Sequence, residues 1–204
     1  MNTKQLILTT AYQLFQARSY QEVSITDICT ACNLTKPAFY YHFSSKSELL
    51  IHYYKRVVET LSLNIDTKTA DYWQQYLTYF TELVQASIKL GPDMISQLFI
   101  TNLTVDKGSF DFIQKFADIC IELITQAQAT GQVRTRQRPK NLFITSAFLF
   151  TGYEVYWAIK NDDFDQIKNV LSSLEVLFDV APEFSHYEST TNLLHNKYLP
   201  DQDG

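Results

Sequence analysis

The sequence predicts an all-α protein with an N-terminal three-helix helix-turn-helix domain and a larger helical domain behind it. Apolar residues make up 46% of the 204 residues, which is enough to bury a core. Five glycines and five prolines are few for this length and disfavour a turn-rich β architecture. Apolar side chains also recur at helical spacing along most of the chain.

Four helices are predicted in the first part of the chain. The first spans about residues 3–18, where four apolar side chains share one face: Ile7, Ala11, Leu14 and Phe15. Three short helices follow, each after a residue that can cap it. Ser24 precedes a helix of about 25–31, Thr35 one of about 36–42, and Ser44 or Ser45 one that begins near Lys46.

Five longer helices are expected after these, at about 70–89, 93–104, 109–130, 140–160 and 164–180. Turn residues separate them, at Gly91-Pro92, Asp106-Lys107-Gly108, Gly131 and Asp162-Asp163. The tail from about Glu183 is polar, and we expect it to be weakly ordered with a short helix near Leu193. The predicted division is an N-terminal domain at 1–46, a larger helical domain at 47–182 and a tail at 183–204.

Charge is distributed unevenly along the chain. The net charge is −5, which alone argues against a nucleic-acid partner. Residues 1–56, however, carry six cations and three anions, whereas the remainder carries 11 cations and 19 anions. A basic head on an acidic body is typical of a protein that touches phosphates at one end only.

Composition disfavours a secreted or membrane protein. Three cysteines are too few, and odd in number, for a secreted disulfide framework. The N-terminal segment carries Gln and Thr throughout and does not resemble a signal peptide. Phe143 to Ile159 is the most apolar stretch, and Thr, Ser, Gly and Glu154 interrupt it, so we expect it to be too short and too polar to span a bilayer. The sequence predicts a cytoplasmic protein with no membrane partner.

The segment from Ser24 to Leu50 carries the strongest signal. It reads SITDICTACNLTKPAFYYHFSSKSELL and predicts two short helices that meet at a tight turn. Asn33 stands where the backbone must be left-handed, which Asn tolerates better than most residues. Pro37 falls in the first turn of the next helix, where its missing N–H costs nothing. Ile28 and Phe39 are expected to point inward and fix the angle between the helices.

The outer arc of the helix at 36–42 has an unusual composition. If Phe39 and Phe43 point inward, a step of about 100° per residue leaves four residues on the outside: Pro37, Ala38, Tyr40 and Tyr41. Lys36 and His42 flank them. A face meant only for water would more often carry Glu and Lys. The alternatives are ordinary surface tyrosines, a packing role for His42 and a merely solvated Lys46.

This segment resembles the TetR family of bacterial regulators. The resemblance rests on Ile7, Ala11, Leu14, Phe15 and Tyr20, and then on SITDICTACNLTKPAFYYHFSSKSELL. This motif covers about a quarter of the chain. The later part of the chain resembles the family in the order of its helices. It also resembles the family around Gly131-Gln132-Val133, which precedes an aromatic-rich helix that ends in Trp157. Ser19 and Asn33 depart from the family, because both stand at positions where it usually has Gly.

The resemblance implies roles for particular residues. Lys36, Ala38 and Tyr41 would face base edges. The residues that would face phosphate are Thr35, Tyr40, His42 and Lys46, with Thr26 as a weaker candidate. It further implies a homodimer on a pseudo-palindromic double-stranded DNA operator. In such a dimer, a small-molecule effector would release the DNA by favouring a different spacing of the reading helices.

Neither catalysis nor metal binding is indicated. The pair Cys29 and Cys32 could suggest redox chemistry or zinc, but Cys120 lies far away in the sequence and no histidine cluster completes four ligands. We therefore predict small core residues at both positions, with no metal and no cofactor. No nucleophile elbow or phosphate-binding glycine loop is present either, so an enzyme with a helical fold is a weak rival.

Aromatic residues in the larger domain predict an effector pocket. Tyrosine and tryptophan carry polar ends that need partners, which a core of leucine and isoleucine would avoid. The candidate pocket residues are Trp73, Tyr76, Phe80, Phe99, Phe116, Tyr153 and Trp157, with Glu154 as a further candidate. Glu154 could instead face solvent or an interface. If it faces inward, a hydrophobic cation becomes a possible ligand, and the carboxyl should have a partner or a raised pKa.

Assembly is predicted from the last two long helices. The helix at 164–180 has a wide apolar stripe: Ile167, Val170, Leu171, Leu174, Leu177 and Phe178. The helix at 140–160 adds Phe148, Val155 and Ile159. The favoured function is a repressor released by a hydrophobic or aromatic effector. The alternative is an architectural or protein-partnered DNA-binding factor without an effector.

Overall fold

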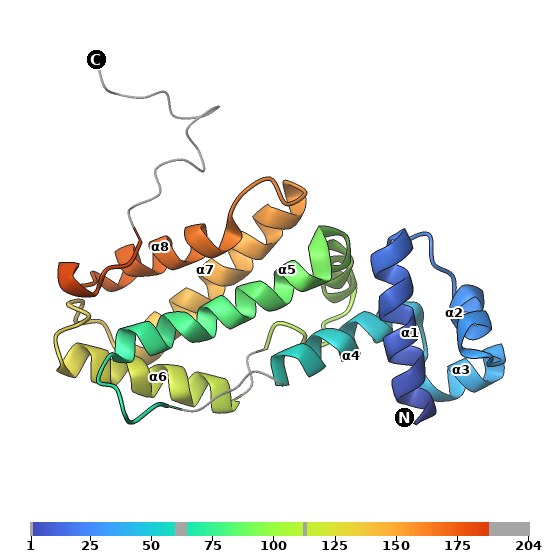
Figure 1. Cartoon of the computed structure of the whole chain (residues 1–204), viewed down its shortest axis with the longest axis horizontal. Helices are drawn as coiled ribbons and strands as arrows, with labels where there is room; N and C mark the ends of the chain where they lie inside the picture. Colours follow the sequence, from blue (N-terminus) through green and yellow to red (C-terminus); the bar gives the residue numbers. More distant parts are fainter. Residues whose placement is uncertain (1, 60–64, 112–113, 188–204) are drawn as a thin grey trace, which may run out of the picture. The chain divides into compact units, whose positions relative to one another are not determined.

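The computed structural model describes residues 2–59, 65–111 and 114–187. In these residues the regular structure is helical, apart from one isolated bridge between Val133 and Val180. The helices are α1 (Thr3–Arg18), α2 (Ile25–Cys32), α3 (Lys36–His42), α4 (Lys46–Glu59), α5 (Tyr72–Thr104), α6 (Gln114–Ala129), α7 (Pro139–Ile159) and α8 (Gln166–Phe178), followed by a short 3₁₀ turn at Pro182–Phe184 (Figure 1). The predicted all-α fold is confirmed.

The chain forms two compact units that are not continuous in sequence. Unit 1 comprises Met1–Thr60 and Ala86–Asp111 and therefore contains α1 to α4 and the second part of α5. Unit 2 comprises Leu61–Gln85 and Phe112–Gly204 and contains the first part of α5 with α6, α7 and α8. This division differs from the boundary predicted at residue 46. Helix α4 packs against α1, and the second part of α5 belongs to the same unit as the N-terminal helices.

Helix α5 contains a kink where the sequence predicts a break. Gly91 has φ of 82° and ψ of 161°, which is not a helical conformation, and Pro92 follows it. Glycine adopts positive φ without steric cost, and proline removes a backbone donor from the helix. The two helices expected at about 70–89 and 93–104 are therefore the two parts of α5.

Side chains cap the short helices at the predicted residues. Ser24 and Asp27 form a reciprocal capping box at the start of α2, and the Thr35 hydroxyl accepts from the Ala38 N–H at the start of α3. Asn33 ends α2 in the left-handed region, with φ of 54° and ψ of 45°. At the start of α4, the Ser45 hydroxyl accepts from the Glu48 N–H at 3.2 Å. These caps fix the helix ends within one residue of the predictions.

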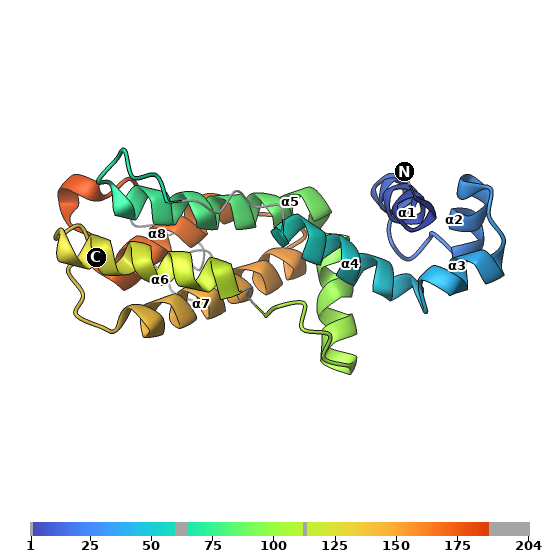
Figure 2. The ribbon, with the colours of Figure 1, turned by 90° about the horizontal axis from the view of Figure 1, so that it is seen from below.

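The core of unit 1 holds α1, α2 and α3 together. Its buried side chains come from all four N-terminal helices and from the turns between them: Ile7, Ala11, Phe15, Val23, Ile28, Phe39, Phe43, Leu49 and Leu50. Figure 2 shows α1 end-on beside α2 and α3. Cys29 and Cys32 are buried, as predicted for small core residues. Burial raises the pKa of the Cys29 thiol, and the nearby Cys32 raises it further.

Unit 2 is a bundle of long helices. The first part of α5 lies beside α6, α7 and α8 in both ribbon views (Figures 1 and 2), and α7 packs between α6 and α8. Helix α6 begins at Gln114, later than the predicted 109, and Phe112 and Ile113 lie outside the described residues. The short helix expected near Leu193 also lies outside them, as does most of the predicted tail.

Helix α7 corrects one expectation. In the described part of the chain it is the helix that is long and apolar enough to cross a membrane by length and composition. The expectation that this stretch is too short and too polar was therefore wrong by those two measures. Core helices also meet this criterion, and α7 packs in unit 2 with Ser146 and Glu154 buried on its inner face.

Candidate DNA-binding surface and buried aromatic cluster

Helix α3 presents the predicted outer arc to solvent. Phe39 is fully buried and packs at 5.9 Å, between ring centroids, from the buried Phe43. That anchoring leaves Tyr41 86% exposed and Tyr40 54% exposed. Large aromatic side chains gain by burial, so such exposure at adjacent positions indicates a surface that meets a partner.

Polar residues surround these two tyrosines. Thr26, Thr35 and Lys36 are exposed, while Ala38 and His42 are half-buried. The Thr35 hydroxyl accepts a hydrogen bond from the Ala38 N–H and so keeps its own proton available to donate. The His42 ring lies 5.0 Å from the Tyr41 ring, edge to face. Helix α3 and its N-cap thus contain six of the eight predicted DNA-contacting residues, and Thr26 is the second residue of α2.

Lys46 is the eighth predicted DNA-contacting residue, and its ammonium group makes two hydrogen bonds within unit 1. It donates to the carbonyl of Tyr20 at 2.7 Å and to the carbonyl of Val23 at 2.9 Å, and it lies 4.0 Å from the centroid of the Tyr20 ring. Partial burial lowers the pKa of Lys46, and the nearby Asp93 carboxylate opposes this. One N–H of the ammonium remains available, so its phosphate contact stays a prediction.

Four of the predicted effector-binding residues form one aromatic cluster in unit 2. Trp73 stacks on Tyr76 at 5.4 Å, Tyr76 contacts Phe80 at 5.0 Å, and Phe80 lies 6.2 Å from Phe116. Phe178 closes the cluster against Trp73. Burial raises the pKa of the Tyr76 phenol well above its ordinary value; the nearby Cys120 raises it further, while the Ser146 hydroxyl partly opposes both.

The other four predicted pocket residues are placed differently. Phe99 belongs to unit 1, where it stacks on Phe110 at 4.3 Å, and so it lies outside the cluster. The hydroxyl of Tyr153 shares a 2.7 Å hydrogen bond with Ser173 on α8. Trp157 is buried and donates to Asp162 at 2.8 Å. The sequence did not distinguish these residues from the members of the cluster, because both groups recur at helical spacing. Only the three-dimensional packing distinguishes them.

Glu154 is fully buried on the inner face of α7. The alternative in which it faces solvent is therefore wrong. Its carboxyl does not lack an interaction partner, so its burial by itself does not call for a cationic ligand. Glu154 therefore does not support a cationic effector over a neutral one.

Sequence reasoning missed Gln166 as a buried polar residue. Gln166, at the start of α8, is 1% exposed, and neither end of its amide makes a hydrogen bond to the described residues. The indole N–H of Trp73 is also buried without such a partner. Leaving buried polar groups unpaired is costly, so each such group calls for an unseen partner. The position of Gln166 on an apolar stripe could have flagged it in the sequence.

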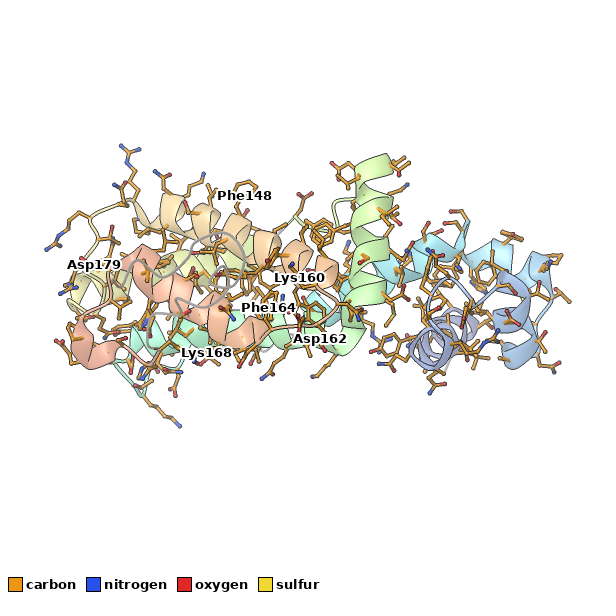
Figure 3. All side chains as sticks on the ribbon, turned by 90° about the horizontal axis from the view of Figure 1, so that it is seen from above. Phe148, Lys160, Asp162, Phe164, Lys168 and Asp179 are labelled. Carbon is orange, nitrogen blue, oxygen red and sulfur yellow. The ribbon has the colours of Figure 1, made fainter. Side chains whose placement is uncertain are left out.

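A row of exposed apolar residues runs along the outer face of α7. Its members lie at helical spacing: Ile144, Phe148, Val155 and Ile159, with Val176 exposed on α8. Phe148 is 74% exposed and points away from the ribbon (Figure 3). In contrast, Val170, Leu171, Leu174 and Phe178 are buried within unit 2. The stripe predicted to serve both core and partner is therefore mainly core, and the exposed apolar surface lies mainly on α7.

Comparison with known families identifies the N-terminal segment. Residues 7–53 match the model of the bacterial regulatory proteins, tetR family. An uncharacterised HTH-type transcriptional regulator of Bacillus subtilis, YuxN, is 40% identical over 127 residues, which is 61% of this chain and 41% of that protein. The transposon Tn10 TetC protein of Escherichia coli is 40% identical over 68 residues, which is 33% of this chain and 34% of that protein. The matches thus span less than half the length of these relatives.

Solved structures share the fold over most of the chain. Thermus thermophilus FadR, a TetR family transcriptional repressor in complex with lauroyl-CoA, has a TM-score of 0.60 at 18% identity, over 85% of this chain and 92% of that one. CprB from S. coelicolor has a TM-score of 0.56 at 14% identity, over 89% of this chain and 91% of that one. At such identities the likeness shows the fold alone. The N-terminal segment, with the capped helices that carry Tyr40 and Tyr41, is therefore similar to the bacterial regulatory proteins of the tetR family, and the chain shares its fold with these solved structures.

Proposed function

We propose that this protein is a sequence-specific DNA-binding transcriptional regulator of the cytoplasm, acting as a repressor that a small molecule releases from its operator. The observation that carries the proposal is the exposed pair Tyr40 and Tyr41 on a helix anchored by the buried Phe39. A rigid helix that presents aromatic and hydrogen-bonding side chains suits the major groove, whose base edges carry a readable pattern of donors and acceptors.

Contacts are proposed in two classes. Lys36, Ala38 and Tyr41 would read base edges. The groups proposed to contact phosphates belong to Thr26, Thr35, Tyr40 and His42. Phosphate contacts set register and carry no sequence information, whereas base contacts specify the operator. The net positive charge of residues 1–56 supports this use of the surface, because it favours association with the phosphate backbone.

Selection of operators from random-sequence duplex DNA tests the proposal. Tyr41→Ala should change the selected sequence as well as the affinity. Tyr40→Phe should weaken binding to all sequences alike by roughly fivefold, the effect of one lost hydrogen bond. Tyr156→Phe, a tyrosine change in unit 2, is the control and should leave affinity unchanged. Unchanged affinity and sequence preference in both α3 variants would overturn the assignment of α3 as the reading helix.

We propose that the protein is a homodimer that uses the outer face of α7. The exposed row of Ile144, Phe148, Val155 and Ile159 is continuous at helical spacing. Gly152 is exposed, and a Cβ built there would meet no atom within 4 Å, so a partner helix could approach α7 closely at its middle. A two-fold axis at this face would pair α7 and Val176 of α8 with their copies, and so place two reading helices on a pseudo-palindromic operator.

We propose that the effector binds in unit 2, against the aromatic cluster of Trp73, Tyr76, Phe80 and Phe116. The buried indole N–H of Trp73 and the amide of Gln166, which have no partner among the described residues, support a ligand that offers hydrogen bonds as well as apolar surface. We expect a flat or hydrophobic compound. The alternative, an architectural or protein-partnered factor without an effector, would leave these polar atoms to bound water.

A further inference from the structure

The turn between α1 and α2 adopts a conformation that its sequence disfavours. Ser19 has φ of 71° and ψ of 156°. Residues other than glycine rarely occupy this region, since the Cβ atom clashes with the backbone there. Such a turn persists only when surrounding contacts hold it in place. The following residue, Tyr20, shows what those contacts are.

Side chains from two distant helices bind both backbone groups of Tyr20. Its N–H donates to a carboxylate oxygen of Asp93 at 2.6 Å, and its carbonyl accepts from the Lys46 ammonium at 2.7 Å. The same ammonium donates at 2.9 Å to the carbonyl of Val23, which lies two residues before the start of α2. Charge-assisted bonds of this kind are stronger than those between neutral groups. The turn is therefore held from α4 on one side and from α5 on the other.

Packing and charge reinforce these bonds. The Tyr20 ring is buried, lies 5.0 Å from the Phe15 ring and lies beneath the Lys46 ammonium at 4.0 Å. Burial and, to a smaller extent, the Asp93 carboxylate raise the pKa of Tyr20 to about 12, so the phenol stays neutral beside the carboxylate. The negative Asp93 thus faces a backbone donor, and the positive Lys46 faces backbone acceptors.

Asp93 follows the α5 kink directly. It stands two residues after Gly91, whose positive φ breaks the helix. On the other side of the kink, the carbonyl of Lys89 accepts from the Tyr12 hydroxyl at 3.0 Å and from the Gln16 amide at 3.3 Å. Carbonyls near a kink lack their usual helical donors, and α1 supplies replacements. Within unit 1, α1 and the turn that follows it are bonded on both sides of the kink.

We propose that Asp93 and Lys46 are positioning residues for DNA recognition: they clamp the Ser19–Tyr20 turn and so fix α2 and α3 relative to α1 and to the kink of α5. The inference rests on the proposed DNA-binding function and adds residues that touch no base. Without the clamp, Ser19 relaxes to a negative φ, the direction of the chain into α2 changes, and Tyr41 no longer meets its base. The operator affinity thereby depends on the conformation of α5 at Gly91.

The test uses the full-length protein and two readouts. Hydrogen exchange of the Tyr20 amide, followed by NMR, reports the clamp itself; fluorescence anisotropy with a selected operator reports DNA binding. Asp93→Ala should speed exchange of the Tyr20 amide and lower operator affinity by about tenfold or more, the worth of a hydrogen bond to a charged group. Asp93→Asn keeps an acceptor oxygen and should lose less. Asp106→Ala removes an equal charge elsewhere in unit 1 and should change neither readout.

A second substitution separates positioning from general stability. Ser19→Gly in the Asp93→Ala background should restore operator affinity to within about threefold of the natural protein, since glycine adopts this conformation without strain. The salt dependence of binding should stay unchanged in all variants, because no phosphate contact is removed. Natural affinity in Asp93→Ala, or a loss that Ser19→Gly does not restore, overturns the proposal. If the natural protein binds no selected DNA, the proposed function fails, and Tyr20 exchange still decides whether Asp93 holds the turn.

Discussion

The helix-turn-helix and the α7–α8 pair differ in what determines their structure. Helices α2 and α3 have eight and seven residues, too short to be stable alone, and a side chain within three residues caps the N-terminal end of each. Helices α7 and α8 have 21 and 13 residues, and apolar side chains lie on more than one face of α7. Caps are local and can be read from sequence. Which apolar face of a long helix enters the core depends on its neighbours.

Phe148 and Leu174 show this difference most clearly. Both are large apolar residues that the sequence assigned to a common interface. The structure leaves Phe148 74% exposed on α7 and buries Leu174 completely on α8. The same kind of residue therefore serves a surface in one helix and the core in the next. The predictions below test this contrast, starting with the largest effect.

Leu174→Asp should unfold unit 2. Removing a buried leucine costs about 2–5 kcal/mol, and burying an unpaired carboxylate adds to this. Phe148→Glu should instead leave the helix content unchanged at 25 °C and convert the dimer to a monomer. Circular dichroism and light scattering measure the two outcomes. Leu103→Glu, at another exposed apolar position, is the control and should remain dimeric.

A dimer that survives Phe148→Glu would remove the outer face of α7 from the interface. A folded Leu174→Asp variant would contradict the placement of α8 in the core. These two variants together therefore also decide whether the apolar stripe of α8 serves both the core and the dimer interface, as its width in the sequence indicates.

Two glutamines of unit 2 should respond oppositely to the same change. Gln166→Leu removes a buried amide that has no partner among the described residues, so we expect a gain of about 1 kcal/mol in the free energy of unfolding. Gln128→Leu breaks hydrogen bonds to the carbonyls of Thr135 and Gln137, at 2.7 and 2.9 Å, and should destabilise by a similar amount. Thermal denaturation without ligand measures both signs.

If the effector binds the Gln166 amide, the stability order of Gln166→Leu and the natural protein should reverse when the effector is present. A thermal-shift screen should compare neutral aromatic compounds, quaternary ammonium compounds and lauroyl-CoA, the ligand that FadR holds. We expect a hit to stabilise the natural protein and the Gln128→Leu variant and to stabilise Gln166→Leu less. Equal shifts in all three would place Gln166 outside the effector site.

Two lysines of α4 give the smallest expected effect, which is a change in the salt dependence of DNA binding. Lys46→Ala should lower operator affinity because its bonds to Tyr20 and Val23 are lost, and it should also reduce the slope of log affinity against log salt by about one if its third N–H meets a phosphate. Lys55→Ala, an exposed lysine on the same helix, should leave the slope unchanged. Anisotropy titrations over a range of salt concentrations measure both. An affinity loss at an unchanged slope would exclude the phosphate contact of Lys46 and leave its bonds to Tyr20 and Val23 as its only role.

The sequence by itself determined the helix-turn-helix. Ser24, Asn33 and Thr35 define the ends of α2 and α3 through bonds within a few residues, and the buried Phe39 then leaves Tyr40 and Tyr41 outside. These relations depend on helix geometry and short-range hydrogen bonds, so they can be predicted from the sequence without knowledge of the distant contacts. The predicted reading surface needed little more than these residues.

Only the tertiary structure decided the relations between distant residues. It joined Asp93 to Tyr20 across 73 positions, turned the Lys46 ammonium toward two carbonyls and separated Phe99 from the aromatic cluster. It also buried Glu154 and Leu174 while leaving Phe148 exposed. The physical reason is that helical periodicity gives a residue's face on its own helix, whereas burial and long-range bonds depend on which other helix covers that face.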